Sequence, residues 1–197
     1  MFRKFPFVFL AFILSACTAG ISAPTPTPSS GQIDLEAQAV YAALLHNLYS
    51  SSSFVIMDTT ATSPGGVGET PSSLDFIMQN MHGVASETRD SFLGRNAAAH
   101  PVSPHMDLGT AYVLLTQEEM SKIFSQNQDG WQIFYEQFPG TPGITTLSQV
   151  GFNNTFDQAL VYVGTMSHWL AGAGYYVLLN KVNGAWVVDQ QVMSWIS

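Results

Sequence analysis

The end of the chain alternates between short apolar runs and turn residues, and this pattern constrains the fold more than any other feature. Between the segments Tyr175–Val182 and Trp186–Ile196 lies the pair Asn183-Gly184. Asn-Gly is the preferred centre of a type I′ turn, because both residues need a positive φ, and strands joined in this way form a tight antiparallel hairpin. Both flanking segments are rich in β-branched and aromatic residues, as strands are. The chain is therefore predicted to end in a hairpin.

Two more strands are predicted ahead of this hairpin, over Ile144–Phe152 and Gln158–Gly164, with a turn at Asn153-Asn154 between them. Further upstream, apolar residues recur every three or four positions, a spacing typical of helices. Two short strands are also predicted there, over Phe54–Thr60 and Ala111–Leu115. The predicted helices are Asp34–Tyr49 with Asp34 as N-cap, Ser72–Met81 and Thr116–Phe124 with capping boxes, Ala85–Leu93, and Trp131–Phe138. We expect an α+β domain, with N-terminal helices packed on a C-terminal four-stranded antiparallel meander.

The first 17 residues have the layout of an export signal. A basic pair, Arg3-Lys4, precedes the apolar run Phe5–Leu14, and two small residues lead to Cys17, the only cysteine of the chain. The run is too short to cross a bilayer, which takes roughly 20 apolar residues. This stretch resembles a bacterial lipoprotein signal peptide with its lipobox. The resemblance implies removal of residues 1–16, a diacylglycerol on the Cys17 thiol, and often an acyl group such as palmitate on its amine.

The same resemblance implies a location. Two or more acyl chains hold a protein stably at a membrane, so the mature chain would be anchored through Cys17 without spanning. Thr18 replaces the Asp that retains Gram-negative lipoproteins at the inner membrane, which implies an extracytoplasmic protein, at the outer membrane if the organism is Gram-negative. The alternative is an ordinary cleaved signal with Cys17 as an incidental thiol. Residues 17–31 are rich in Pro, Thr and Ser and are predicted to be a tether, and residues 32–197 a single domain.

Charge narrows the range of partners. Without residues 1–16 the chain keeps four Lys and Arg residues against 14 Asp and Glu residues, for a formal charge of −10. The four cations, Arg89, Arg95, Lys122 and Lys181, are scattered. Nucleic acid and anionic lipid headgroups are bound through clustered Lys and Arg, so we expect neither as a partner. An envelope protein or a glycan is the expected kind of partner.

Motifs from about residue 85 to the C-terminus resemble those of a family of uncharacterised bacterial lipoproteins. The segments that carry the resemblance are Gly130-Trp131, Phe138-Pro139-Gly140, Val150-Gly151-Phe152-Asn153, Gln158–Gly164, Ala171–Leu179 and Trp195-Ile196-Ser197. This resemblance implies a common fold unit and no particular reaction. The order of elements is also similar in outline to NTF2-like and cystatin-like domains, a similarity that implies nothing about function.

One candidate site lies around His168-Trp169, in a predicted loop from Thr165 to Gly174. Functional residues often lie on loops held by a rigid sheet, and a histidine can act as a general base near neutral pH. Asp157 and Tyr162 precede it and complete the catalytic candidates, whereas Trp169 and Tyr175 are candidates for ligand binding. The alternative is a hairpin tip whose tryptophan folds back on the sheet.

A second candidate is the segment His100–Asp107, where His100, His105 and Asp107 offer ligands that suit zinc. Pro101 and Pro104 prevent the helical H-E-x-x-H arrangement, so exposed polar residues without a metal are the alternative reading.

The sequence indicates binding more than catalysis. It contains no G-x-S-x-G nucleophile elbow and no second cysteine, and it indicates no cofactor. We therefore expect a lipid-anchored binding or interaction module of the bacterial envelope. Aromatic side chains could stack on sugars, although core packing is the commoner role; they are Trp131, Tyr135, Trp169, Tyr175, Tyr176, Trp186 and Trp195. The alternative, which stays open, is a small envelope hydrolase or metal-dependent enzyme that uses His168, or His100 and His105.

Overall fold

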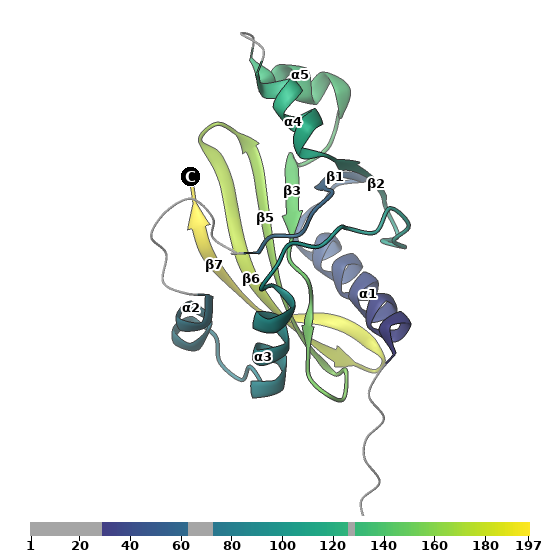
Figure 1. Cartoon of the computed structure of the whole chain (residues 1–197), viewed down its shortest axis with the longest axis vertical. Helices are drawn as coiled ribbons and strands as arrows, with labels where there is room; N and C mark the ends of the chain where they lie inside the picture. The colour runs from purple at the N-terminus through teal and green to yellow at the C-terminus, as the bar shows by residue number, and fades with distance from the viewer. Residues whose placement is uncertain (1–28, 63–72, 126–128) are drawn as a thin grey trace, which may run out of the picture.

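A computed structural model describes residues 29–62, 73–125 and 129–197 (Figure 1). The predicted signal peptide, the lipidation site Cys17, most of the tether, the loop at 63–71 and the Ser72 cap lie outside the described residues. The chain is a mixed α+β protein, with helices in its N-terminal part and a sheet that fills its C-terminal part. Among the helices of the described ranges, none combines the length and the apolarity needed to cross a bilayer.

The sheet has seven strands over the described residues, in the order β2-β1-β3-β5-β6-β7, with β4 paired to β5. Strand β1 is parallel to both β2 and β3, and all other pairs are antiparallel. The strands are β1 (Ser53–Met57), β2 (Ala111–Leu115), β3 (Ile144–Leu147), β4 (Gly151–Phe152), β5 (Gln158–His168), β6 (Ala171–Val182) and β7 (Ala185–Ile196).

The predicted four-stranded antiparallel meander is therefore wrong. Only β5, β6 and β7 form a meander, and the two short upstream strands join the same sheet instead of standing apart. Helical segments separate β1 from β2 and β2 from β3. Parallel strands need such long crossover connections, because a tight turn joins only antiparallel neighbours. Of the helices expected to precede the sheet, only the one at Ser30–Leu48 does so, and the other four lie in the crossovers within it.

Five helices complete the described part of the chain: α1 (Ser30–Leu48), α2 (Ser73–Asn80), α3 (Ser86–Arg95), α4 (Gln117–Phe124) and α5 (Gly130–Gln137). Helix α1 begins four residues before the predicted start, because the Ser29 hydroxyl accepts the Gln32 N–H at 3.3 Å and caps it in place of Asp34. The predicted domain start at Gln32 thus falls inside α1. The capping box at Thr116 and Glu119 is confirmed.

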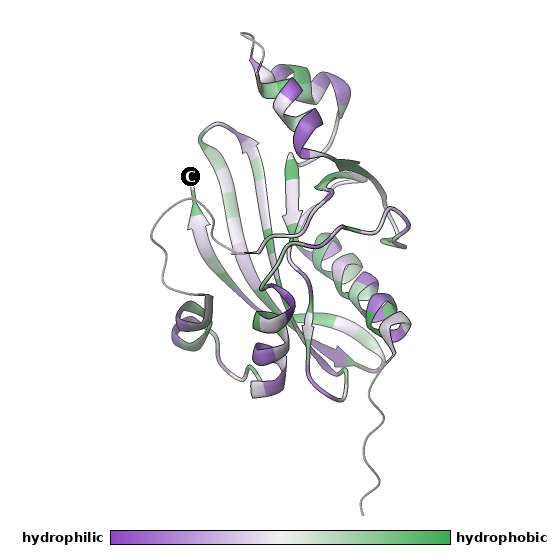
Figure 2. Ribbon diagram, in the orientation of Figure 1, coloured by the Kyte–Doolittle hydropathy of each residue, from purple (hydrophilic) through white to green (hydrophobic). Residues whose placement is uncertain are grey.

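The helices cover the two faces of the sheet unequally (Figure 1). Val161 and Val163 of β5 pack in one hydrophobic cluster with Leu44 and other residues of α1. Leu160 and Tyr162, which point to the opposite face because side chains alternate along a strand, pack with residues of α2 and α3. Figure 2 shows hydrophobic residues along these central strands and a mixture of polar and apolar residues on α1.

Helices α4 and α5 lie on the same face as α2 and α3. Their cluster contains Met57 of β1 and Ile144 of β3, and Ile144 pairs with Met166 of β5. Met166 is an even number of residues from Leu160 and Tyr162, so it shares their face. One face of the sheet therefore carries α1, and the other carries two helical pairs over different strands.

The predicted strand Ile144–Phe152 is broken into β3 and β4 by an irregular step at Ser148–Val150. The side chain of Asn96, at the C-terminal end of α3, replaces the missing strand partner. Its amide donates to the Gln149 carbonyl at 3.0 Å and its carbonyl oxygen accepts the Gln149 N–H at 2.8 Å. The step therefore has a long-range cause that the local sequence does not contain.

Of the two hairpins of the meander, one agrees with the sequence prediction and the other does not. The Asn183-Gly184 turn is confirmed, with φ of 51° and 84°. The predicted loop from Thr165 to Gly174 is wrong, because β5 and β6 continue to a two-residue tip, Trp169 and Leu170. Two of the small residues in this segment, Gly172 and Gly174, lie against the Trp195 indole: a Cβ on Gly174 would lie 2.0 Å from Nε1 of Trp195. Small residues that suggest a loop are thus strand residues beneath an indole.

Candidate functional site

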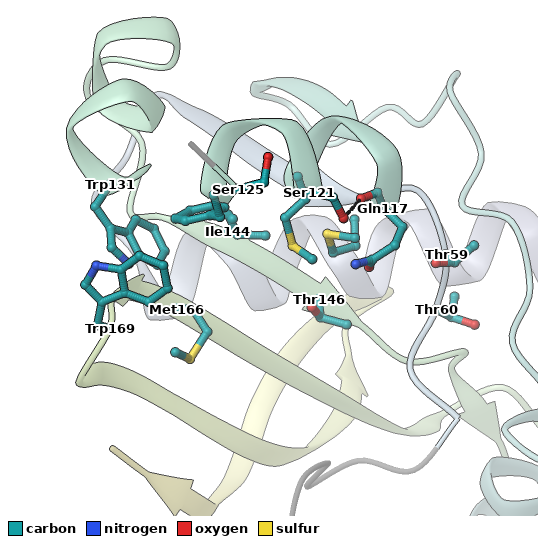
Figure 3. Close-up of a pocket in the computed structure, with 13 residues that line it drawn as sticks. Thr59, Thr60, Gln117, Ser121, Ser125, Trp131, Ile144, Thr146, Met166 and Trp169 are labelled. Atoms are coloured by element: carbon teal, nitrogen blue, oxygen red, sulfur yellow. Dashed lines mark hydrogen bonds between the residues drawn. The ribbon is translucent and has the colours of Figure 1, made fainter. Parts of the chain in front are cut away.

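A cleft of about 720 Å³ lies on the face that carries α4 and α5. Its floor is made by Met57 of β1, Ile144 and Thr146 of β3, and Met166 of β5. The parallel pairing of β1 with β3 and the antiparallel pairing of β3 with β5 bring these residues side by side. Figure 3 shows the cleft as an elongated space between these strands and α4.

Helix α4 forms one wall of the cleft through Gln117, Met120, Ser121 and Phe124. The capping box fixes the start of this helix: the Thr116 hydroxyl accepts the Glu119 N–H at 3.1 Å, and the Glu119 carboxylate accepts the Thr116 N–H at 2.9 Å. The bond from the Thr116 N–H, together with one that the Thr116 hydroxyl donates to the carboxylate at 2.8 Å, lowers the pKa of the Glu119 carboxyl below its usual range. The remaining lining residues are Thr59, Thr60, Ser125, Trp131 and Trp169.

Aromatic rings close one end of the cleft. Phe124 lies edge-on to Trp131 and to Trp169, with ring centroids 4.9 and 5.4 Å apart, and the two indoles are 6.4 Å apart (Figure 3). Trp131 is buried at 4% exposure, whereas Trp169 is 54% exposed. The Tyr135 hydroxyl donates to the Ser167 carbonyl at 2.9 Å and ties α5 to the strand next to the tip. The β5–β6 tip is thereby docked on the helical pair.

Two glycines permit this close packing. A Cβ at Gly143, where φ is +119°, would lie 2.1 Å from the Met166 carbonyl oxygen. A Cβ at Gly130 would lie 2.5 Å from a ring carbon of Phe124. Any side chain at these positions would displace β5 or the Phe124 ring, and both line the cleft.

The chemistry of the cleft is apolar and uncharged. Its lining combines thioethers, indoles and a phenyl ring with hydroxyl and amide groups, and among the described residues no Asp, Glu, Lys, Arg or His lines it. Ligand sites of 300–1,000 Å³ with mostly apolar walls and a few polar groups are typical of small-molecule pockets. Methionine side chains adapt to guests of irregular shape. The arrangement can bind and shield an apolar molecule, and its own side chains offer no charged group for acid–base chemistry.

The structure separates the residues predicted around His168. Trp169 lines the cleft, and the exposed His168 ring stacks on Trp131 at a centroid distance of 6.3 Å. The His168 side chain makes no hydrogen bond with any residue of the described ranges, so no general-base partner is seen for it there. Tyr175 packs with the cluster on the α1 face, away from the cleft.

Asp157 and Tyr162 do not join His168. Asp157 lies in the turn before β5 and His168 ends that strand, so roughly 35 Å of extended chain separates them. Hydrogen bonds from the Asn153 and Thr155 side chains lower the pKa of the Asp157 carboxyl, a pattern typical of a turn. The Tyr162 hydroxyl accepts the Trp195 indole N–H at 2.7 Å within the cluster beneath α2 and α3.

The histidines of the second candidate are exposed in the segment before β2. The backbone of His100 is bonded to Thr60, and the carboxylate of Asp107 accepts the Gly109 N–H at 3.3 Å. Within the described ranges, no group of three or more His, Cys, Asp or Glu side chains is placed to hold a metal ion.

The aromatic candidates divide between cleft and core. Trp131, Tyr135 and Trp169 gather at the cleft end, whereas Tyr176, Trp186 and Trp195 lie elsewhere in the sheet. Sequence reasoning missed Met57, Met120 and Thr146. Met57 and Met120 have the spacing of core residues, so no signal in the sequence separates them from residues that are fully covered.

Comparisons with protein-family models, with curated proteins and with solved structures find no match to the chain.

Proposed function

We propose that the chain is a lipid-anchored binding module of the bacterial cell envelope, held at the membrane through Cys17, whose cleft takes an uncharged and largely apolar ligand such as an acyl chain. The observation that carries the proposal is the lining of the cleft, which combines apolar and aromatic side chains with uncharged polar ones and has no charged side chain among the described residues. Burying apolar surface in such a site contributes roughly 25 cal/mol per Å².

The shape and chemistry of the cleft favour an acyl chain over a sugar. A sugar brings many hydroxyl groups, and each one loses free energy when it is buried without a hydrogen-bond partner. The floor offers sulfur and aliphatic carbon at Met57, Ile144 and Met166. An elongated guest could lie along the floor from Thr59 to the indole of Trp169, the two ends of the space in Figure 3.

The envelope location is supported by the N-terminal sequence. The basic pair, the short apolar run and the small residues before Cys17 together match a lipoprotein signal. An apolar ligand site on a membrane-tethered protein would lie close to the lipids that could supply its guest. In fractionated cells we expect the wild-type chain with the membranes and a Cys17→Ser variant in the soluble fraction. A variant that stayed equally membrane-bound would contradict the anchor.

The ligand proposal is tested with residues 29–197, which carry every described helix and strand. The protein is titrated with the methyl ester of a brominated fatty acid, which is uncharged, while tryptophan fluorescence is followed, because bromine quenches an indole only at short range. We expect saturable quenching that is reduced by Trp169→Phe and unaffected by Trp186→Phe, since Trp186 is buried against α1 on the far face. Cooperative thermal unfolding is the control for folding.

A matched pair of charge substitutions checks the location. Ser121 is an exposed residue of α4 at the cleft wall, and Gln132 is an exposed residue of α5 that does not line it. Ser121→Arg places a charge beside the guest and is expected to weaken binding about tenfold, or ~1.4 kcal/mol. Gln132→Arg is expected to bind as the wild type does. Equal affinities for both variants, or no saturable quenching, would refute the proposal.

A further inference from the structure

A second cavity, of about 400 Å³, adjoins the cleft at Thr60 and is otherwise lined by different residues. Helix α1, the end of α3, the segment before β2 and the step between β3 and β4 meet around it. Unlike the cleft, it has charged residues in its lining: Asp34 from α1 and Arg95 from α3.

The neutral polar side chains of this cavity are engaged within the protein. The Tyr41 hydroxyl donates to the Ser148 carbonyl at 2.8 Å, and burial raises the pKa of that hydroxyl. Gln38 accepts the Asp107 N–H at 3.0 Å, and the Thr60 hydroxyl accepts the His100 N–H at 3.0 Å.

The two charged side chains of the cavity could form further hydrogen bonds or ion pairs. Arg95 donates from Nη2 to the Gln149 side chain, and its buried Nε–H has no acceptor among the described residues. A guanidinium has five N–H donors, and a partly buried charge without a counter-ion is costly. Asp34 makes no hydrogen bond or ion pair within the described ranges, although it lines the same cavity.

Comparison with the other cations of the domain shows that this is unusual. Arg89, Lys122 and Lys181 each form an ion pair with a carboxylate, at 2.7, 2.7 and 2.6 Å. Arg95 has no ion pair with any described residue, even though acidic residues greatly outnumber basic ones in the chain. Asp34 and Arg95 do not pair with each other, so they present opposite charges to the same space.

We infer that this cavity binds a small zwitterion, a molecule with both a carboxylate and an ammonium group, such as an amino acid or a dipeptide. The carboxylate is held by the Arg95 guanidinium, whose planar fork suits bidentate bonding, and the ammonium group by the Asp34 carboxylate. A simple anion would meet repulsion from Asp34 and from the net negative charge of the chain. Only Thr60 lines both this cavity and the apolar cleft, and the inference does not rest on the ligand proposed for the cleft.

The test is calorimetric titration of the full chain, purified in a non-ionic detergent, with three matched probes. The probes are the dipeptide Ala-Ala, its N-acetyl derivative, which lacks the ammonium group, and its C-terminal amide, which lacks the carboxylate. We expect Ala-Ala to bind at least about tenfold more tightly than either derivative, equivalent to ~1.4 kcal/mol. No binding of Ala-Ala at concentrations up to about 10 mM, or equal binding of the acetylated probe, would overturn the inference.

Substitutions of Asp34 and Arg95 test which side chain binds which end of the dipeptide. Asp34→Asn is expected to remove the preference for Ala-Ala over the acetylated probe, and Arg95→Gln the preference over the amide. Arg89→Gln, on the same helix but paired with Asp90, is the control and is expected to leave all three affinities unchanged. A loss with Arg89→Gln as large as that with Arg95→Gln would overturn the assignment. If Arg95→Gln fails to fold, Asp34→Asn still decides the outcome, because Asp34 is an exposed helical residue.

Discussion

The Asn96→Ala substitution tests the explanation given for the broken strand. Asn96 is 4% exposed, and its side chain makes three hydrogen bonds, two of them to the backbone of Gln149 and one to the Phe92 carbonyl at 2.8 Å. Alanine removes all three and leaves the backbone of the step between β3 and β4 without its side-chain partner. We expect the substitution to destabilise the junction between α3 and the sheet.

The size of the expected loss of stability depends on which groups keep another hydrogen-bond partner in the variant. The Phe92 carbonyl still accepts the Asn96 N–H at 3.1 Å, and the Gln149 carbonyl still accepts the Ser148 hydroxyl at 2.9 Å. The Gln149 N–H loses its acceptor, which costs roughly 1–3 kcal/mol, and the other two bonds contribute about 1 kcal/mol together. The expected loss is about 2–4 kcal/mol, or roughly 5–15 °C in Tm for a domain of this size.

Urea unfolding of the variant and the wild type measures this loss, provided that both have the same dependence on urea. Asn80→Ala is the matched control, because Asn80 donates to the carbonyl four residues before it at 2.9 Å, as Asn96 does, but on an exposed part of α2. The control is expected to cost less than about 0.5 kcal/mol. If both variants lost the same free energy, the structural role assigned to Asn96 would be refuted.

Two other predictions concern the cleft. In urea unfolding, Gly143→Ala is expected to lower the free energy of unfolding by about 2 kcal/mol more than Gly140→Ala does. Both glycines have positive φ, but only a Cβ at Gly143 would clash with a backbone oxygen. Equal losses for the two variants would refute the clash. Because the pKa of the Glu119 carboxyl is lower in the folded than in the unfolded chain, its charged form stabilises the fold at pH values above the ordinary pKa of 4.5. This stabilisation is lost as the pH falls through the lower pKa of the folded chain. The Tm difference between wild type and Glu119→Gln should therefore shrink from about pH 6 to about pH 3, and a constant difference would contradict it.

Local signals predicted the parts of the fold that local geometry determines. The Asn183-Gly184 turn and the Thr116 capping box depend on residues within a few positions of each other, and both are confirmed. The break after Leu147 was missed because it depends on Asn96, which lies 53 residues from Gln149. The partners of β1 were missed for a similar reason, since a short apolar strand carries no signal for parallel pairing across a helical crossover.

The candidate site also has one part that local sequence signals predict and another part that they do not. Trp169 was singled out from its place near a turn, and the structure places it at the cleft. The floor of the cleft was not predicted, because Met57 and Ile144 have the apolar character of core residues. Whether such residues are covered depends on where α4 and α5 lie, and the pattern of a single strand does not contain that information.

The most direct test of the proposed binding role is photo-cross-linking in intact cells. A benzoylphenylalanine residue is placed at position 121, at the cleft wall, or at position 132, which lies outside it. After irradiation, the purified chains are analysed by mass spectrometry. The proposal predicts a discrete adduct with the mass of a small lipid at position 121 and none at position 132. Unmodified protein at position 121, or the same adducts at both positions, would contradict an apolar ligand in the cleft.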